Sequence, residues 1–147
     1  MRKMMVVICS ALILLAGCGK EEEIPKLLNV DLTVEPTNGE KNEPVTFQAK
    51  VTYGDEKVKD ADDVSFEIWL ANSEDHEKVA ATHKGDGIYE LEKSFAEEGT
   101  YYVYAHVTAR DMHNMPKEEF VIGNPSSPED NGGSKSMDEM DHEESDK

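Results

Sequence analysis

The chain has 147 residues and a formal net charge of −17, from 32 acidic and 15 basic side chains. This length suits one domain with short appendages, because single domains usually run to about 100–200 residues. The excess of carboxylates argues against a nucleic-acid partner, whose phosphates are bound by Lys and Arg. It also argues against adsorption onto an anionic membrane surface.

The first 17 residues have the pattern of a bacterial lipoprotein signal peptide. Two basic residues precede an apolar run from Met4 to Ala16. The run is too short for a membrane-spanning helix, which needs about 20 residues, but it fits the apolar region of a secretory signal. It ends in Leu-Ala-Gly-Cys at residues 15–18, the lipobox pattern. We expect Cys18 to carry lipid and to hold the mature chain on the extracytoplasmic face of the cell membrane.

Lipidation at this position would leave the mature chain without a free thiol. Cys9 lies inside the signal peptide and Cys18 would carry the lipid, and these are the two cysteines of the sequence. We therefore expect neither a disulfide nor a catalytic cysteine.

The rest of the chain divides into a tether, a domain and a tail. Residues 18–26 contain the lipidated cysteine and a short acidic tether, and residues 27–123 carry the pattern of a folded domain. Residues 124–147 hold eight acidic and two basic residues and no aromatic one. Such a composition cannot bury enough apolar surface to offset its ordering entropy, so we expect a disordered acidic tail.

Apolar and polar residues alternate through residues 27–123, which predicts half-buried β-strands. In chain order the predicted strands are Leu28–Val34, Val45–Tyr53, Val64–Leu70, a weak strand at Val79 and Ala81, Tyr89–Phe95, Tyr101–Ala109 and Phe120–Ile122. Turn residues separate them, and Glu97–Tyr101 resembles the turn before a tyrosine corner. The pattern predicts an all-β fold, an immunoglobulin-like antiparallel β-sandwich of about seven strands.

The predicted strand at residues 101–109 has two different faces. Its odd-numbered residues are expected in the core, whereas Tyr102, Tyr104 and His106 are expected on an exposed outer face. Trp69 is expected to face outwards from a neighbouring strand, so the three aromatic side chains would form one candidate protein-contact patch. Coverage of this patch by the tether or a loop is the alternative.

The segment from His106 to Pro116 holds two histidines and two methionines. Imidazole and thioether groups together favour copper, Cu(I) especially, whereas hard cations prefer oxygen. The segment therefore suggests a copper site made by His106, Met112, His113 and Met115. The alternative is a solvated histidine beside a loop whose methionines cap the end of the sandwich.

Further candidate ligands lie elsewhere in the chain. His76 and His83 could each supply another ligand if their loops lie at the same end of the fold, although a surface histidine is the default interpretation. Met137, Met140 and His142 lie in the acidic tail and could capture copper weakly; an acidic tail that happens to contain them is the simpler interpretation.

The sequence carries no motif of an enzyme. It contains no Gly-framed serine nucleophile, no His-Glu-x-x-His and no phosphate-cradling glycine loop. Carboxylates are so numerous that no pair stands out as acid and base. We therefore predict a binding protein and not an enzyme.

The lipobox and the strand pattern resemble those of the YtkA-like domain family of bacterial extracytoplasmic lipoproteins. The motifs that support this resemblance are Gly85-Asp86-Gly87-Ile88-Tyr89, Gly99-Thr100-Tyr101-Tyr102 and the segment from His106 to Pro116. The resemblance covers roughly residues 27–123. It implies an immunoglobulin-like fold and a link to copper handling or cytochrome oxidase assembly, carried here by His106, Met112, His113 and Met115.

Two functions follow as hypotheses. The favoured one is a lipid-anchored protein that binds or delivers copper through a His/Met site, with an envelope or oxidase-assembly protein as partner. The alternative is a metal-free interaction module of the cell envelope that uses the face formed by Trp69, Tyr102 and Tyr104.

Overall fold

The computed structural model describes residues 24–128, and within this range the regular structure consists of strands alone. In chain order the strands are β1 (Leu28–Glu35), β2 (Asn38–Gly39), β3 (Pro44–Tyr53), β4 (Glu56–Lys57), β5 (Asp63–Leu70), β6 (His76–Ala80), β7 (Thr82–Gly85), β8 (Ile88–Ser94), β9 (Gly99–Ala109), β10 (Met112–Asn114) and β11 (Lys117–Ile122). The described residues include no helix that could span a membrane.

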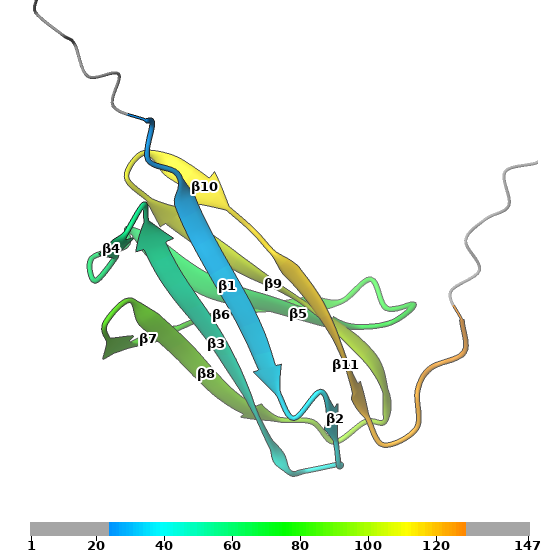
Figure 1. Cartoon of the computed structure of the whole chain (residues 1–147). Coiled ribbons are helices and arrows are strands. Elements are labelled where there is room, and N and C mark those ends of the chain that lie inside the picture. Colours follow the sequence, from blue (N-terminus) through cyan, green and yellow to red (C-terminus); the bar gives the residue numbers. More distant parts are fainter. Residues whose placement is uncertain (1–23, 129–147) are drawn as a thin grey trace, which may run out of the picture.

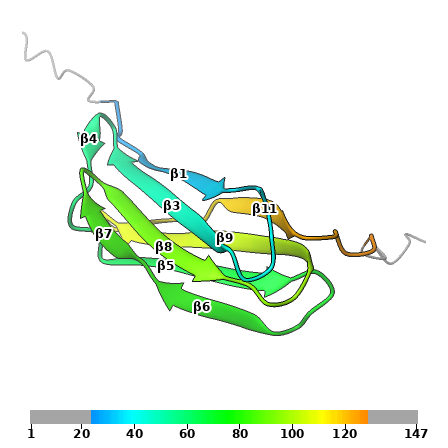
Figure 2. The same ribbon diagram turned by 90° about the horizontal axis from the view of Figure 1, so that it is seen from below.

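The strands form two sheets that pack face to face (Figures 1 and 2). The β3 sheet has the order β1-β3-β8-β7, with β4 paired to β3, and the β9 sheet has the order β2-β11-β9-β5-β6, with β10 paired to β9. The pairing is antiparallel except between β2 and β11. This division of the strands is that of immunoglobulin-like sandwiches, so the predicted fold is confirmed.

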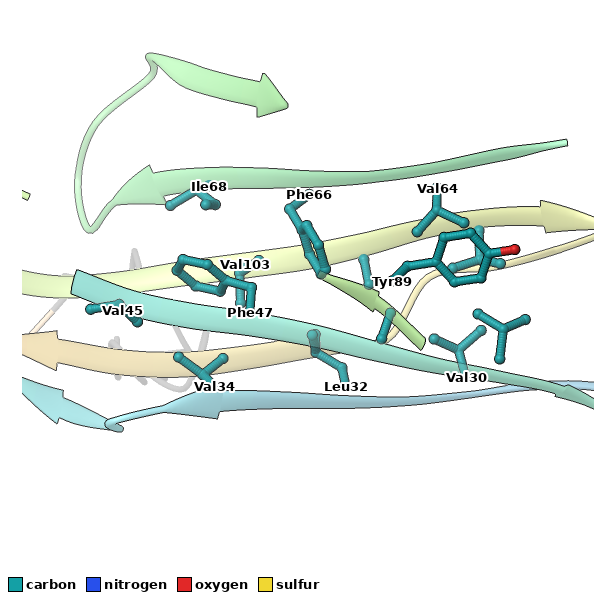
Figure 3. Packing of buried hydrophobic residues seen from close by; sticks show 14 of the residues in the cluster. Val30, Leu32, Val34, Val45, Phe47, Val64, Phe66, Ile68, Tyr89 and Val103 are labelled. Atoms are coloured by element: carbon teal, nitrogen blue, oxygen red, sulfur yellow. The ribbon is translucent and has the colours of Figure 1, made fainter. Parts of the chain in front are cut away.

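The core lies between the two sheets and is built from alternating residues (Figure 3). Every second residue of β1 and of β9 is buried, as the alternation predicts. Phe47 of the β3 sheet contacts Phe66 and Phe120 of the β9 sheet, with ring centroids 5.9 and 5.2 Å apart. Because side chains alternate across a strand, the buried residues of β9 place Tyr102, Tyr104 and His106 on its outer face.

The alternation pattern misses four short strands, β2, β4, β7 and β10, because two to four residues are too few to show a period. The weak fourth strand predicted at Val79 and Ala81 corresponds to β6, which ends at Ala80. Val79 lies in β6, which pairs with β5, and the chain then crosses to β7, which pairs with β8 of the other sheet. Ala81 lies between them, at the point where the chain changes sheets.

Some sequence predictions fall outside the described residues. These are the signal peptide at residues 1–17, the lipidated Cys18 with residues 19–23 of the tether, and residues 129–147 of the predicted disordered tail, among them Met137, Met140 and His142.

Candidate functional site

The segment after β9 forms a β-hairpin, where the sequence predicts a loop. The two turn residues, Arg110 and Asp111, have φ angles of 53° and 57°. Positive φ at both central residues is typical of a type I′ turn, whose twist matches that of the flanking strands. The turn pairs Met112 with Ala109 and His113 with Thr108. The hairpin therefore fixes which side chains of this segment share a face.

The pairing with β9 keeps one register along β10 and β11. His113 pairs with Thr108, and further along Lys117 pairs with Tyr104. Both pairs belong to one antiparallel register. Between β10 and β11, the Ala105 amide donates a hydrogen bond to the Pro116 carbonyl and so continues that register. Met115 therefore lies opposite His106.

Three of the four predicted copper ligands share the outer face of the β9 sheet. The ring centroids of His106 and His113 are 5.8 Å apart. Met115, opposite His106, is 42% exposed and is one of the large apolar residues that the described chain leaves open to solvent. His113 is also exposed, so both side chains are accessible to a metal ion.

His106 is less accessible than the sequence predicts. Only 14% of its side chain is exposed, because Glu67 of β5 covers one edge of the ring. The Nε2 atom of His106 donates a hydrogen bond of 2.6 Å to Oε2 of Glu67. The ring is therefore held in one orientation on the sheet.

The structure does not bring the other candidates to this cluster directly. Met112 pairs with Ala109 and packs against the core, on the opposite side of the sheet from His113. His83 lies on β7 of the β3 sheet, where its ring is 4.7 Å from that of Tyr89. His76 lies on the outer face of the β9 sheet, but it reaches the cluster only through Glu67.

Glu67 joins two of the three histidines of this face, His76 and His106. Its Oε1 accepts a 2.7 Å hydrogen bond from Nδ1 of His76, and its Oε2 binds His106. The hydrogen bond from His76, and next the one from His106, hold the pKa of Glu67 below its usual value. The carboxyl group is therefore ionised at neutral pH and acts as an acceptor for both rings.

The aromatic side chains predicted to lie together form a cluster. Trp69 lies 5.6 Å from Tyr102 and 5.3 Å from Tyr104 between ring centroids, and it stacks on His76 at 4.4 Å. The ammonium group of Lys117 lies over the three rings, 4.2 Å from the centroid of Tyr102. Within residues 24–128, a lysine of β11 thus lies over the outer aromatic face.

The hairpin turn is fixed to the neighbouring loop by charge. Arg110 donates hydrogen bonds to Glu56 at 3.0 Å and to Asp60 at 2.9 Å. The guanidinium group lowers the pKa of Asp60, mainly through this hydrogen bond, and both carboxylates raise the pKa of Arg110. These contacts tie the β9–β10 turn to the segment between β3 and β5.

The donor atoms on this face define the kind of metal that fits it. Two imidazoles and one thioether are ligands that suit copper and not a hard cation. Among the described residues, no group of three or more His, Cys, Asp and Glu side chains is arranged to hold a metal ion. A site on this face therefore depends on Met115.

Glu67, Lys117 and Arg110 are the important residues that sequence reasoning misses. Each contacts a residue that is far away in sequence: Glu67 is 39 positions from His106, Lys117 is 48 positions from Trp69, and Arg110 is 50 positions from Asp60. The alternation in β5 places Glu67 outwards beside Trp69, which is the one local signal for it.

The fold and this face together define an extended immunoglobulin-like sandwich with a histidine, methionine and aromatic surface on one sheet. The chain matches the family model described as YtkA-like over residues 22–106, more than half of its length, and it belongs to that family. The matched range includes Glu67, Trp69 and His106 and ends before His113 and Met115.

Other comparisons give distant structural likenesses. An engineered protein has 17% sequence identity and a TM-score of 0.49, over 65% of this chain and 20% of its own. The soluble domain of PmoD from Methylocystis sp. ATCC 49242 (Rockwell) has 12% identity and a TM-score of 0.42, over 67% of this chain and 92% of its own. Alkylpurine DNA glycosylase AlkC from Pseudomonas fluorescens has 12% identity and a TM-score of 0.46, over 65% of this chain and 30% of its own.

These likenesses carry no argument about function. The chain spans 20% of the length of the engineered protein, so the likeness concerns one part of that protein. A search among curated proteins finds no match.

Proposed function

We propose that this protein is a lipid-anchored, extracytoplasmic copper-binding protein that carries or delivers the ion and does not catalyse a reaction. The observation that supports it is the β9–β10 hairpin, which gathers His106, His113 and Met115 on one face. The proposed anchor at Cys18 rests on the sequence pattern of residues 1–18.

The ligand set is His106, His113 and Met115, with Met112 left out because it packs against the core. Two imidazole nitrogens and one thioether sulfur suit Cu(I), and His113 and Met115 are both open to solvent. The formal net charge of −17 favours a high local concentration of cations around the domain.

Copper titration of the full chain in detergent, against a competing chelator, tests this proposal. We expect Cu(I) to bind more tightly than micromolar, and His113→Ala and Met115→Ala each to weaken binding at least about tenfold, since each removes one ligand. The parent chain and all variants carry the same changes at Met137, Met140 and His142, so that the tail adds no ligand to any of them.

Two controls match these variants. His83→Ala removes a histidine of the other sheet, and Met112→Leu keeps the volume of a side chain that packs on the core. Both should bind copper as the parent does. Equal affinity of the parent and the His113→Ala variant would exclude the copper function.

The second candidate function is a metal-free interaction module of the cell envelope. The observation that favours it is the cluster of Trp69, Tyr102 and Tyr104, which forms a continuous aromatic surface under Lys117. An envelope or oxidase-assembly protein would be the partner. A crosslinked partner that is lost on Trp69→Ala and kept on His113→Ala would support this function, and a partner kept by both variants would contradict it.

A further inference from the structure

The hydrogen bond between His106 and Glu67 determines which ring nitrogen of His106 keeps a lone pair for a metal ion. An ionised carboxylate can only accept hydrogen bonds, so the nitrogen that faces it must carry a proton. In His106 this nitrogen is Nε2, which lies 2.6 Å from Oε2 of Glu67. A neutral imidazole then has its lone pair on Nδ1, and a metal binds to the nitrogen with the lone pair.

Glu67 is itself held in place from its other side. Oε1 accepts a hydrogen bond of 2.7 Å from Nδ1 of His76, and the His76 ring stacks on Trp69 with an interplanar angle of 10°. The side chain of Glu67 is 24% exposed, so most of it is packed between these neighbours. Trp69, His76, Glu67 and His106 thus form one connected row across β6, β5 and β9.

The second histidine contacts a hydroxyl group and not a carboxylate. Nδ1 of His113 lies 2.9 Å from the hydroxyl oxygen of Thr108. A hydroxyl group can donate or accept a hydrogen bond, so either nitrogen of His113 can carry the proton beside it. Of the two rings, His106 is therefore the one whose tautomer is fixed by its neighbour.

We propose that Glu67 is a positioning residue that fixes His106 with its proton on Nε2, so that Nδ1 is the nitrogen that binds the metal. This inference rests on the proposed copper function and adds to it the residue that orients a ligand. Carboxylates that orient metal-binding histidines in this way typically change metal affinity by about 10–100-fold when they are removed.

NMR of the metal-free full chain in detergent, with ¹⁵N-labelled histidine, tests the positioning role without copper. In the parent we expect the Nε2 proton of His106 to be protected from exchange with water and visible as a separate resonance. Glu67→Ala should abolish this resonance, because the acceptor is gone. His76→Ala should keep it, because Glu67 still faces His106.

A matched control removes a different carboxylate of the same sheet. Glu77→Ala deletes the partner of Lys93, 2.9 Å away, and leaves Glu67 untouched, so the His106 resonance should stay. Absence of the resonance from the parent, or its persistence in Glu67→Ala, would overturn the positioning role. Circular dichroism of each variant establishes that it is folded.

Cu(I) titration of the same variants separates this inference from the copper function. Glu67→Ala should bind Cu(I) about 10–100-fold more weakly than the parent, and Glu77→Ala equally tightly. If Glu67→Ala binds as the parent does, the positioning role is wrong and the copper function stands. If the parent binds no better than His113→Ala, the copper function is wrong, and the NMR result alone decides what Glu67 does to His106.

Discussion

The hydroxyl group of Tyr101 connects the start of β9 to the segment before it, because it donates a 2.9 Å hydrogen bond to the carbonyl of Glu97. Burial, and next the charge of Glu97, raise the pKa of this hydroxyl. The ring packs on Phe120 and Phe95, with centroids 5.3 and 4.7 Å away. This is the tyrosine corner that the sequence resembles, so one local motif predicts both a contact and the position of a strand.

Tyr101→Phe should lower the free energy of unfolding by about 1 kcal/mol, the usual contribution of one hydrogen bond. The ring contacts stay, so the change isolates the hydroxyl group. Urea denaturation of the full chain measures this. Tyr104→Phe is the control, because it removes a hydroxyl from the outer face of the same strand. An equal loss in both variants would contradict a special role for the corner.

At the scale of elements, the β9–β10 hairpin determines the candidate site. Alternation within one strand is a local signal, so the sequence predicts the outer positions of Tyr102, Tyr104 and His106 correctly. The turn at Arg110 and Asp111 has no Gly or Asn to reveal it, so the sequence predicts a loop there. Without the register of a second strand, Met112 and His113 cannot be assigned to opposite faces.

The contact between Glu67 and His106 has a similar origin. It depends on the register of β5 against β9, in which Glu67 pairs with Tyr104 and so lies diagonally from His106. Register between strands this far apart in sequence is set by the packing of the whole core. The ligand types could therefore be predicted from the sequence, and the residue that orients them could not.

Arg110→Gln should release the hairpin turn from the loop before β5. The pKa of Asp60 should rise towards its ordinary value, since the guanidinium group that lowers it is gone. A carboxyl group whose pKa is lowered in the folded state stabilises the fold at pH values above its ordinary pKa. This stabilisation is lost as the pH falls through the folded-state pKa. The stability that Arg110 adds should therefore be present at neutral pH and disappear in acid.

Carboxyl NMR titration and hydrogen exchange of the β10 amides measure this effect. In Arg110→Gln, β10 should exchange faster than in the parent at neutral pH, and the difference should vanish below the pKa of Asp60. Lys57→Gln is the control, since Lys57 contacts Asp86 in the same region. Unchanged exchange and an unchanged pKa in Arg110→Gln would disprove the link.

At the scale of the whole molecule, packing between the sheets stabilises the sandwich. The described residues contain no cysteine, so no disulfide joins the two sheets within them. Phe47 is fully buried and contacts three other phenylalanine rings: Phe66 and Phe120 of the opposite sheet, and Phe95 beyond β8. The sequence predicts this core, because the alternation of apolar and polar residues is visible within each strand separately.

Phe47→Ala should cost about 3–5 kcal/mol of unfolding free energy, since it leaves a large cavity between the sheets. Phe47→Leu should cost much less, because most of the volume is kept. Chemical denaturation of both variants tests this. Similar costs for the two would mean that aromatic contacts, and not the filled volume, determine stability here.

The β10 strand lies at the end of the sandwich where β1 begins. Asn114 donates a 3.0 Å hydrogen bond to the carbonyl of Leu28, so the hairpin lies beside the start of β1 (Figure 1). With a lipid on Cys18, the chain between Cys18 and Leu28 could extend to at most about 35 Å. The hairpin end of the sandwich would then stay close above the bilayer, within reach of proteins embedded in the same membrane.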